Sequence, residues 1–136
     1  MSEDAEDRRQ ANLAAARRYA DAWASGDFPG LMATYHDDFV LHWFGENPHA
    51  RTYRGKAEAI GALMAFTRHT GRRLIGVGDV MAGPERAVIL ARESLTADGE
   101  TREVERVLVY RVKDGLMAEC WVYDEDQRFI DRALQA

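Results

Sequence analysis

Two Asp-Gly pairs, Asp98-Gly99 and Asp114-Gly115, divide the C-terminal part of the chain into three apolar-rich segments. Both central positions of a tight two-residue turn need positive φ angles, and Asp followed by Gly tolerates them well. Each pair therefore predicts a β-hairpin. Two hairpins in a row predict three consecutive antiparallel strands, and the rest of the chain is expected to cover the sheet that they form.

The first turn fixes the register of its hairpin and places Glu93 opposite Val104. Strand side chains alternate in direction, so each face can be assigned. One face is predicted to carry Ile89, Ala91, Glu93, Leu95, Val104, Arg106, Leu108 and Tyr110. The other is predicted to carry Val88, Leu90, Arg92, Glu105, Val107 and Val109. Because both faces are substantially apolar, we expect one to meet a core or cavity and the other a partner.

Composition narrows the class of protein. The 136 residues are 46% hydrophobic and 30% charged, which predicts one globular domain over residues 1–136. A net charge of −5 without a basic cluster argues against nucleic acid as a partner. No apolar run approaches the roughly 20 residues of a membrane span, and no signal peptide is visible. The single cysteine, Cys120, permits no internal disulfide, so we expect a cytoplasmic location.

Apolar spacing and helix-stop residues predict the remaining elements. The acidic residues 1–7 are expected to be frayed or to form the opening turn of a helix. Asp27 is predicted to cap a short second helix that includes Tyr35. The other predicted elements are helices over residues 5–24, 56–69 and 126–134 and strands over residues 39–43 and 72–82. This order predicts an α+β fold with helices laid against one antiparallel sheet.

The periodicity also predicts which helical side chains point inward. In the first helix the stripe has Tyr19 on its edge, and in the third helix Met64 points inward. The full inward set is Leu13, Ala16, Ala20, Trp23, Ile60, Leu63, Met64 and Thr67.

Four motifs, Tyr19–Phe28, Tyr35–Phe39, Tyr53–Lys56 and Lys113–Trp121, resemble the nuclear-transport-factor-2-like superfamily. This superfamily includes ketosteroid isomerase, limonene epoxide hydrolase and the SnoaL-like polyketide cyclases. The resemblance implies a cystatin-like, SnoaL-like cone: a curved antiparallel sheet wrapped by three N-terminal helices. It also implies that the open end of the cone holds a small hydrophobic molecule and that two copies form a homodimer.

The resemblance carries over some catalytic positions and removes others. Tyr19 corresponds to the isomerase tyrosine that donates to the developing enolate oxygen, and Asn47 has a counterpart in the epoxide hydrolase. Positions that hold acids or bases in these enzymes are occupied by Trp43, Leu108 and Val122. The family reactions therefore cannot simply be transferred to this chain.

Glu93 and Arg106 are expected on the cavity face, on neighbouring strands and within reach of each other. Glu93 is a candidate general base or acid, with Arg106 beside it, and a structural ion pair is the equal alternative. His42 is a third candidate, because imidazole titrates near neutral pH. Strand alternation opposes it: if Trp43 points inward, His42 points outward. Tyr19 is either a phenolic donor into the cavity or a core tyrosine.

A further set of side chains is expected to line the cavity and bind substrate. Cys120 is predicted to be a buried, inert thiol, and Asp124 is predicted to cap the C-terminal helix together with Asp126, with the cavity edge as its alternative. No metal-ligand spacing and no cofactor motif is present in the sequence. The expected substrate-binding residues are Trp23, Tyr35, Trp43, Asn47, Met64, Leu108, Cys120, Val122 and Asp124.

Two classes of function remain open. The first is a cofactor-independent enzyme that binds an apolar or polycyclic molecule and performs acid/base isomerisation, cyclisation or epoxide opening. The second is a non-catalytic module of the same fold that holds a ligand or only a second copy of the chain. The homodimer is expected to form through the outer sheet face, with Val88, Leu90, Val107, Val109, Trp121 and Tyr123.

Overall fold

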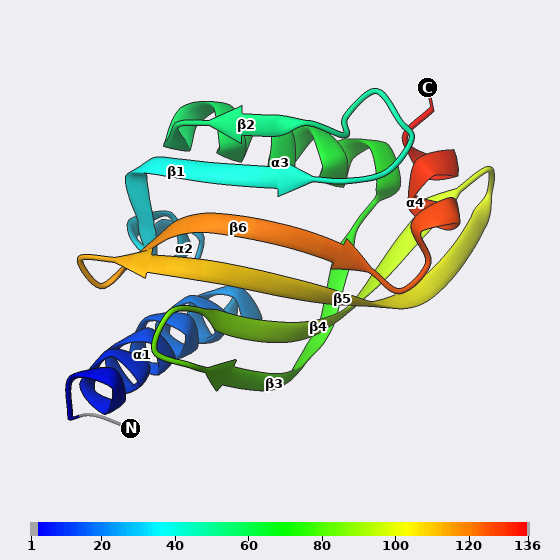
Figure 1. Cartoon of the computed structure of the whole chain (residues 1–136). Coiled ribbons are helices and arrows are strands. Elements are labelled where there is room, and N and C mark those ends of the chain that lie inside the picture. Colours follow the sequence, from blue (N-terminus) through cyan, green and yellow to red (C-terminus); the bar gives the residue numbers. More distant parts are fainter. Residues whose placement is uncertain (1–2, 136) are drawn as a thin grey trace.

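The computed structural model describes residues 3–135 and has an α+β fold, as predicted: a curved sheet with helices packed against it (Figure 1). The helices are α1 (Glu3–Ser25), α2 (Phe28–Ala33), α3 (Lys56–Thr70) and α4 (Gln127–Ala133). The strands are β1 (Tyr35–Trp43), β2 (Thr52–Arg54), β3 (Arg73–Ala82), β4 (Ala87–Ala97), β5 (Glu100–Lys113) and β6 (Leu116–Asp124).

The six strands form one sheet in the order β2-β1-β6-β5-β4-β3. Every neighbouring pair is antiparallel except β1 and β6, which run parallel. The sheet is therefore mixed, which corrects the prediction of an antiparallel sheet. The short strand β2 also lies in a segment that the sequence placed in a loop. Both differences arise from pairing of β1, whose partners no hairpin turn specifies.

The two Asp-Gly turns have the predicted conformation, with φ angles of 52° and 77° in the first and 55° and 73° in the second. Glu93 pairs with Val104, so the predicted register is confirmed. All eight residues assigned to the inner face are buried, with at most 6% of their surface exposed. The predicted outer-face residues remain partly or fully exposed.

The helical prediction needs two corrections. Residues 3–7 form the first turns of α1, as one of the two predicted alternatives has it, whereas residues 1–2 lie outside the described part of the chain. Tyr19 is buried, facing the sheet instead of lying on the edge of the stripe, because Asn12, Ala15 and Ala16 share the packed face with it. Tyr35 begins β1 instead of continuing α2, since it pairs with Met117 of β6.

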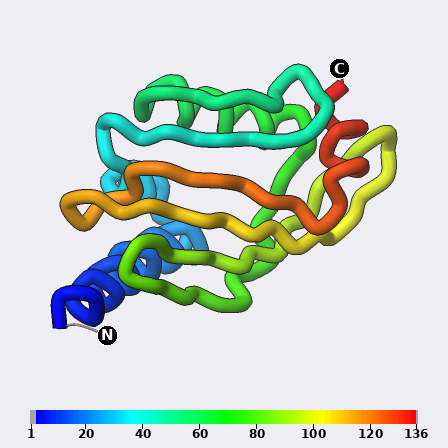
Figure 2. The backbone as a smooth tube through the Cα atoms, viewed as in Figure 1, coloured from blue at the N-terminus to red at the C-terminus, as the bar shows by residue number. Residues whose placement is uncertain are grey.

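The helices enclose the concave face of the sheet. α1 packs on β3 and β4, and α3 packs on β1 and β2, while α4 lies beside the far end of β4 and β6. α1 begins and α4 ends at opposite ends of the sheet (Figure 2). α3 ends at Gly71, whose φ of 61° is the left-handed stop that the sequence predicted. Met64, predicted inward, is 48% exposed. Within residues 3–135, no helix is both long and apolar enough to cross a membrane.

Candidate functional site: a lined cavity with an incomplete polar cluster

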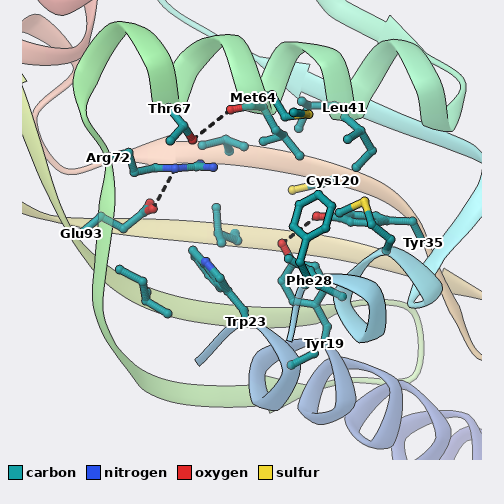
Figure 3. A pocket seen from close by; sticks show the side chains of 18 of the residues that line it. Tyr19, Trp23, Phe28, Tyr35, Leu41, Met64, Thr67, Arg72, Glu93 and Cys120 are labelled. Atoms are coloured by element: carbon teal, nitrogen blue, oxygen red, sulfur yellow. Dashed lines mark hydrogen bonds and ion pairs between the residues drawn. The ribbon is translucent and has the colours of Figure 1, made fainter. Parts of the chain in front are cut away.

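A cavity of about 550 Å³ opens between the concave face of the sheet and helices α1, α2 and α3 (Figure 3). Its size falls within the range of small-molecule sites in proteins. Most of its wall is apolar and comes from both the helices and the strands. The apolar lining includes Trp23, Phe28, Leu31, Leu41, Ile60, Leu63, Leu108 and Val122.

Two arginines and two carboxylates form a buried cluster at one side of this cavity. Arg106 donates from Nη1 to Glu93 Oε2 at 3.3 Å. Arg106 also donates two hydrogen bonds to Asp124, from Nε to Oδ1 at 2.5 Å and from Nη2 to Oδ2 at 3.2 Å. Arg72 Nε lies 3.4 Å from Glu93 Oε1 as an ion pair without hydrogen-bond geometry. Figure 3 shows the Arg72 and Glu93 side chains facing each other at the cavity wall.

The two arginines and the two carboxylates of this cluster balance each other in charge. Burial alone would lower the pKa of Arg106, but the carboxylates of Asp124 and Glu93 hold it above its ordinary value. Arg106 therefore stays a cation and holds Glu93 by one oxygen. The cation also stacks over the Phe66 ring, with its guanidinium carbon 4.6 Å from the ring centroid.

Two buried side-chain atoms within residues 3–135 lack a hydrogen-bond partner: Glu93 Oε1 and Trp43 Nε1. Both residues line the cavity. A buried polar atom without a partner costs free energy, so native structures keep few of them. Both unpartnered atoms therefore belong to residues of the cavity wall.

Tyrosine hydroxyls form a second polar group in the cavity. The Tyr19 and Tyr35 hydroxyls lie 2.9 Å apart, and the Tyr19 and Tyr110 ring centroids lie 5.3 Å apart. Burial raises the pKa of all three phenols, so they remain neutral hydrogen-bond donors at physiological pH. Burial also raises the pKa of the neighbouring Cys120 thiol to about 12, which suits the inert thiol that the sequence predicts.

Residues 16–120 match the family model of the SnoaL-like domain. The chain belongs to the SnoaL-like domain family. This match covers every element from the second half of α1 to the middle of β6. It therefore includes Glu93, Arg106, Arg72 and the tyrosines of the cavity.

Solved structures of the same fold resemble this SnoaL-like chain at low sequence identity. One is a protein of unknown function with a cystatin-like fold from Xanthomonas campestris, with a TM-score of 0.82 and 24% identity, aligned over 92% of this chain and 98% of that one. Another is a protein from Mesorhizobium loti assigned provisionally as a SnoaL-like polyketide cyclase, with a TM-score of 0.68 and 21% identity over 80% and 95% of the two chains.

A third neighbour is TerC co-crystallised with polyporic acid, with a TM-score of 0.73 and 17% identity over 90% and 98% of the two chains. At these identities the likeness shows the fold alone. A search of curated proteins gave no match to this chain.

Most of the predicted site residues of this SnoaL-like domain do surround one cavity. Glu93 and Arg106 meet on the inner face, which confirms the predicted contact and leaves their role to be tested. Met64 contributes to the lining although it is half exposed. The predicted residues that line the cavity are Tyr19, Trp23, Tyr35, Trp43, Met64, Glu93, Arg106, Leu108, Cys120 and Val122.

Three predicted site residues lie elsewhere. His42 points to the outer sheet face, where its Nε2 is 2.5 Å from Glu119 Oε2, because Trp43 takes the inward position. Asn47 donates to Asp131 Oδ1 at 2.7 Å and does not reach the cavity lining. Asp124 neither caps α4 nor lines the cavity, because its carboxylate is bound to Arg106.

Asp126 alone provides the α4 cap, accepting from the Phe129 N–H at 3.1 Å. The predicted joint cap therefore holds for Asp126 only.

Besides Asp27 and Arg68, Arg72 is a charged residue of the cavity lining that was not predicted from the sequence. It follows the Gly71 helix stop and precedes edge strand β3, so the turn geometry directs its side chain under α3. In the sequence, the only indication of this position is an arginine directly after the glycine that ends the helix, and an ordinary surface arginine has the same pattern. Within residues 3–135, no group of three or more His, Cys, Asp or Glu side chains is placed to hold a metal ion.

Proposed function

We propose that this chain is a cofactor-independent SnoaL-like enzyme that binds a small apolar or polycyclic molecule in the cavity and moves a proton on it. Isomerisation, cyclisation and epoxide opening are the reaction types that such proton transfer serves. The observation that supports the proposal most strongly is Glu93 Oε1: a fully buried carboxylate oxygen at the cavity wall with no hydrogen-bond partner.

The arrangement supplies both halves of an acid/base step. For a substrate with a C–H bond next to a carbonyl group, Glu93 Oε1 accepts the proton, and the electrons of that bond form the enolate. The guanidinium of Arg72, 3.4 Å from Glu93, donates to the oxygen on which negative charge develops. Glu93 then returns the proton to the same or a neighbouring carbon. A ligand that fills the apolar cavity displaces water from it, which strengthens both interactions.

The alternative is a binding module of the same fold. It is favoured by the apolar residues Trp43, Leu108 and Val122 at positions that hold acids or bases in related enzymes. All three line the cavity and none carries a titratable group. In this alternative Glu93 and Arg72 bind a ligand without any proton transfer to carbon.

Exchange of carbon-bound hydrogen separates the two functions. We suggest incubating the protein with 2-tetralone, a bicyclic ketone, in deuterium oxide and following deuterium incorporation next to the carbonyl by NMR. The proposal expects exchange above the buffer rate with the wild-type protein and loss of about 100-fold or more in Glu93→Gln, in line with typical general-base contributions. Glu105→Gln, on the opposite face of the same sheet, is the matched control. Exchange at the buffer rate with bound ketone would favour the binding module.

A further inference from the structure

The Arg72 guanidinium offers hydrogen-bond donors that the protein itself does not use. Within residues 3–135 it donates no hydrogen bond, and its one ionic contact is Glu93 Oε1 at 3.4 Å. Its side chain is only 18% exposed, and its guanidinium carbon lies 5.2 Å from the Phe66 ring centroid. A planar guanidinium held over a ring is oriented in advance for a ligand.

Arg72 and Glu93 therefore lie next to each other but need opposite hydrogen-bond partners from a ligand. Guanidinium is a donor only, and an ionised carboxylate is an acceptor only. A ligand with a lone carbonyl group would satisfy Arg72 and leave Glu93 Oε1 unpartnered. A ligand with a lone hydroxyl would satisfy Glu93 and leave Arg72 unused.

We infer that Arg72 and Glu93 together recognise a hydroxyl and a carbonyl group on neighbouring carbons of the ligand. The hydroxyl donates to Glu93 Oε1 and the carbonyl accepts from Arg72. The inference names a substrate class for the proposed function and rests on it, since it concerns the same cavity. The rest of the ligand is apolar and flat, matching a wall that includes Trp23, Trp43 and Phe28.

The charge balance selects a neutral hydroxy-carbonyl group over an anion. The buried cluster holds two cations, Arg72 and Arg106, and two anions, Glu93 and Asp124. An anionic ligand at Arg72 would lie next to the Glu93 carboxylate, and that repulsion is strong where water is excluded. A neutral group adds hydrogen bonds to the cluster without changing its charge.

Three flavones that differ only at one position test this inference. 3-Hydroxyflavone has a hydroxyl beside its carbonyl, 3-methoxyflavone blocks the donor, and flavone lacks it. We expect the wild-type protein to bind 3-hydroxyflavone at least about tenfold more tightly than the other two, as measured by calorimetry. Arg72→Met and Glu93→Gln should each remove this preference. Arg73→Met, an exposed neighbour at the start of β3, should keep it.

The emission of 3-hydroxyflavone gives a second readout, because its dual fluorescence depends on the partner of its hydroxyl group. A hydroxyl bound to Glu93 should lose the emission band of the internal proton-transfer tautomer, and Glu93→Gln should restore that band. Circular dichroism verifies that each variant is folded.

Equal affinity for 3-hydroxyflavone and 3-methoxyflavone, or no binding of any of the three, would overturn the inference. The 2-tetralone exchange reports separately on the proposed function. Exchange that depends on Glu93 without a hydroxyl preference would leave the function in place and remove the substrate class. A preference for the hydroxyl compound without deuterium exchange would support the recognition of the hydroxyl and carbonyl groups and would remove the proposed proton transfer.

Discussion

The two faces of the sheet carry similar ionic groups in very different surroundings. On the inner face Glu93 and Arg106 are 1% and 2% exposed, and their partners are other protein groups. On the outer face Glu119 contacts His42 at 2.5 Å and Arg111 at 3.0 Å, and its side chain is 20% exposed while that of Arg111 is 45% exposed. Water can replace a lost partner on the outer face, but it has little access to the inner one.

Because of this contrast, losing an ion pair should affect stability differently on the two faces. A partly exposed ion pair contributes little to stability because solvent screens it. A buried pair is retained at a high desolvation cost, so removing one member leaves an uncompensated charge. Glu93 Oε1 has an ion pair with Arg72 but no hydrogen bond, and the proposed function gives this oxygen its role.

The largest expected effect comes from breaking the inner cluster. Arg106→Met would leave Glu93 and Asp124 buried without their shared cation. We expect a loss of about 3–5 kcal/mol in the free energy of unfolding, measured by urea denaturation. The matched change on the outer face, Arg111→Met, should lose less than about 1 kcal/mol. Similar losses in both variants would contradict the distinction between the faces.

The second prediction concerns what covers the outer face. We propose that a second copy of the chain packs there, because Val107 and Trp121 are partly exposed and Tyr123 is exposed on this face. Val107→Lys should convert a dimer to a monomer by placing a charge among these apolar side chains, as seen by light scattering. Thr101→Lys, at the exposed tip of the β4–β5 hairpin, should leave the dimer intact. A monomeric wild-type protein would contradict the proposal.

A smaller effect is expected within the tyrosine group of the cavity. Tyr35→Phe removes the hydroxyl that lies 2.9 Å from that of Tyr19 and leaves the latter with one partner fewer. We expect a loss of about 1 kcal/mol in the free energy of unfolding. Tyr123→Phe, an exposed tyrosine of the outer face, should change it by a few tenths of a kcal/mol or less. A neutral Tyr35→Phe would indicate that the hydroxyl contact adds nothing to stability.

The smallest effect is the pH dependence of the outer pair. Burial alone would raise the pKa of Glu119, but hydrogen bonds from His42 and Arg111 outweigh it and lower the value below 4.5. A carboxyl whose pKa is lower in the folded state stabilises the protein above its unfolded pKa and loses this contribution as the pH falls through the folded value. Glu119→Gln should therefore flatten the decline of stability below about pH 4.5 in acid titrations. An unchanged slope would contradict this assignment.

Features that depend on residues close together in the chain could be predicted from the sequence. The first Asp-Gly turn determines the β4–β5 register, because a two-residue turn leaves one way to pair its strands. The β5–β6 register also depends on a bulge, where the pairing shifts between Arg111 and Val112. The contact between Glu93 and Arg106 follows from the β4–β5 register together with strand alternation. Trp43 and His42 likewise follow alternation, so the outward position of His42 was available from the sequence.

What the sequence could not specify depends on contacts between distant segments. The parallel pairing of β1 with β6 joins strands more than seventy residues apart, and no turn encodes it. Asp124 had a plausible local role at a helix cap, and only the folded sheet brings it to Arg106. The path of Arg72 into the cavity likewise depends on how α3 sits on the sheet.

A crystal structure of the wild-type protein with 2-tetralone bound would test the central claim most directly. The account predicts the ketone inside the cavity, with its oxygen within hydrogen-bond distance of Arg72 and its acidic carbon against Glu93 Oε1. A ketone bound outside the cavity, or bound inside it with Glu93 Oε1 turned away to a protein partner, would contradict the account.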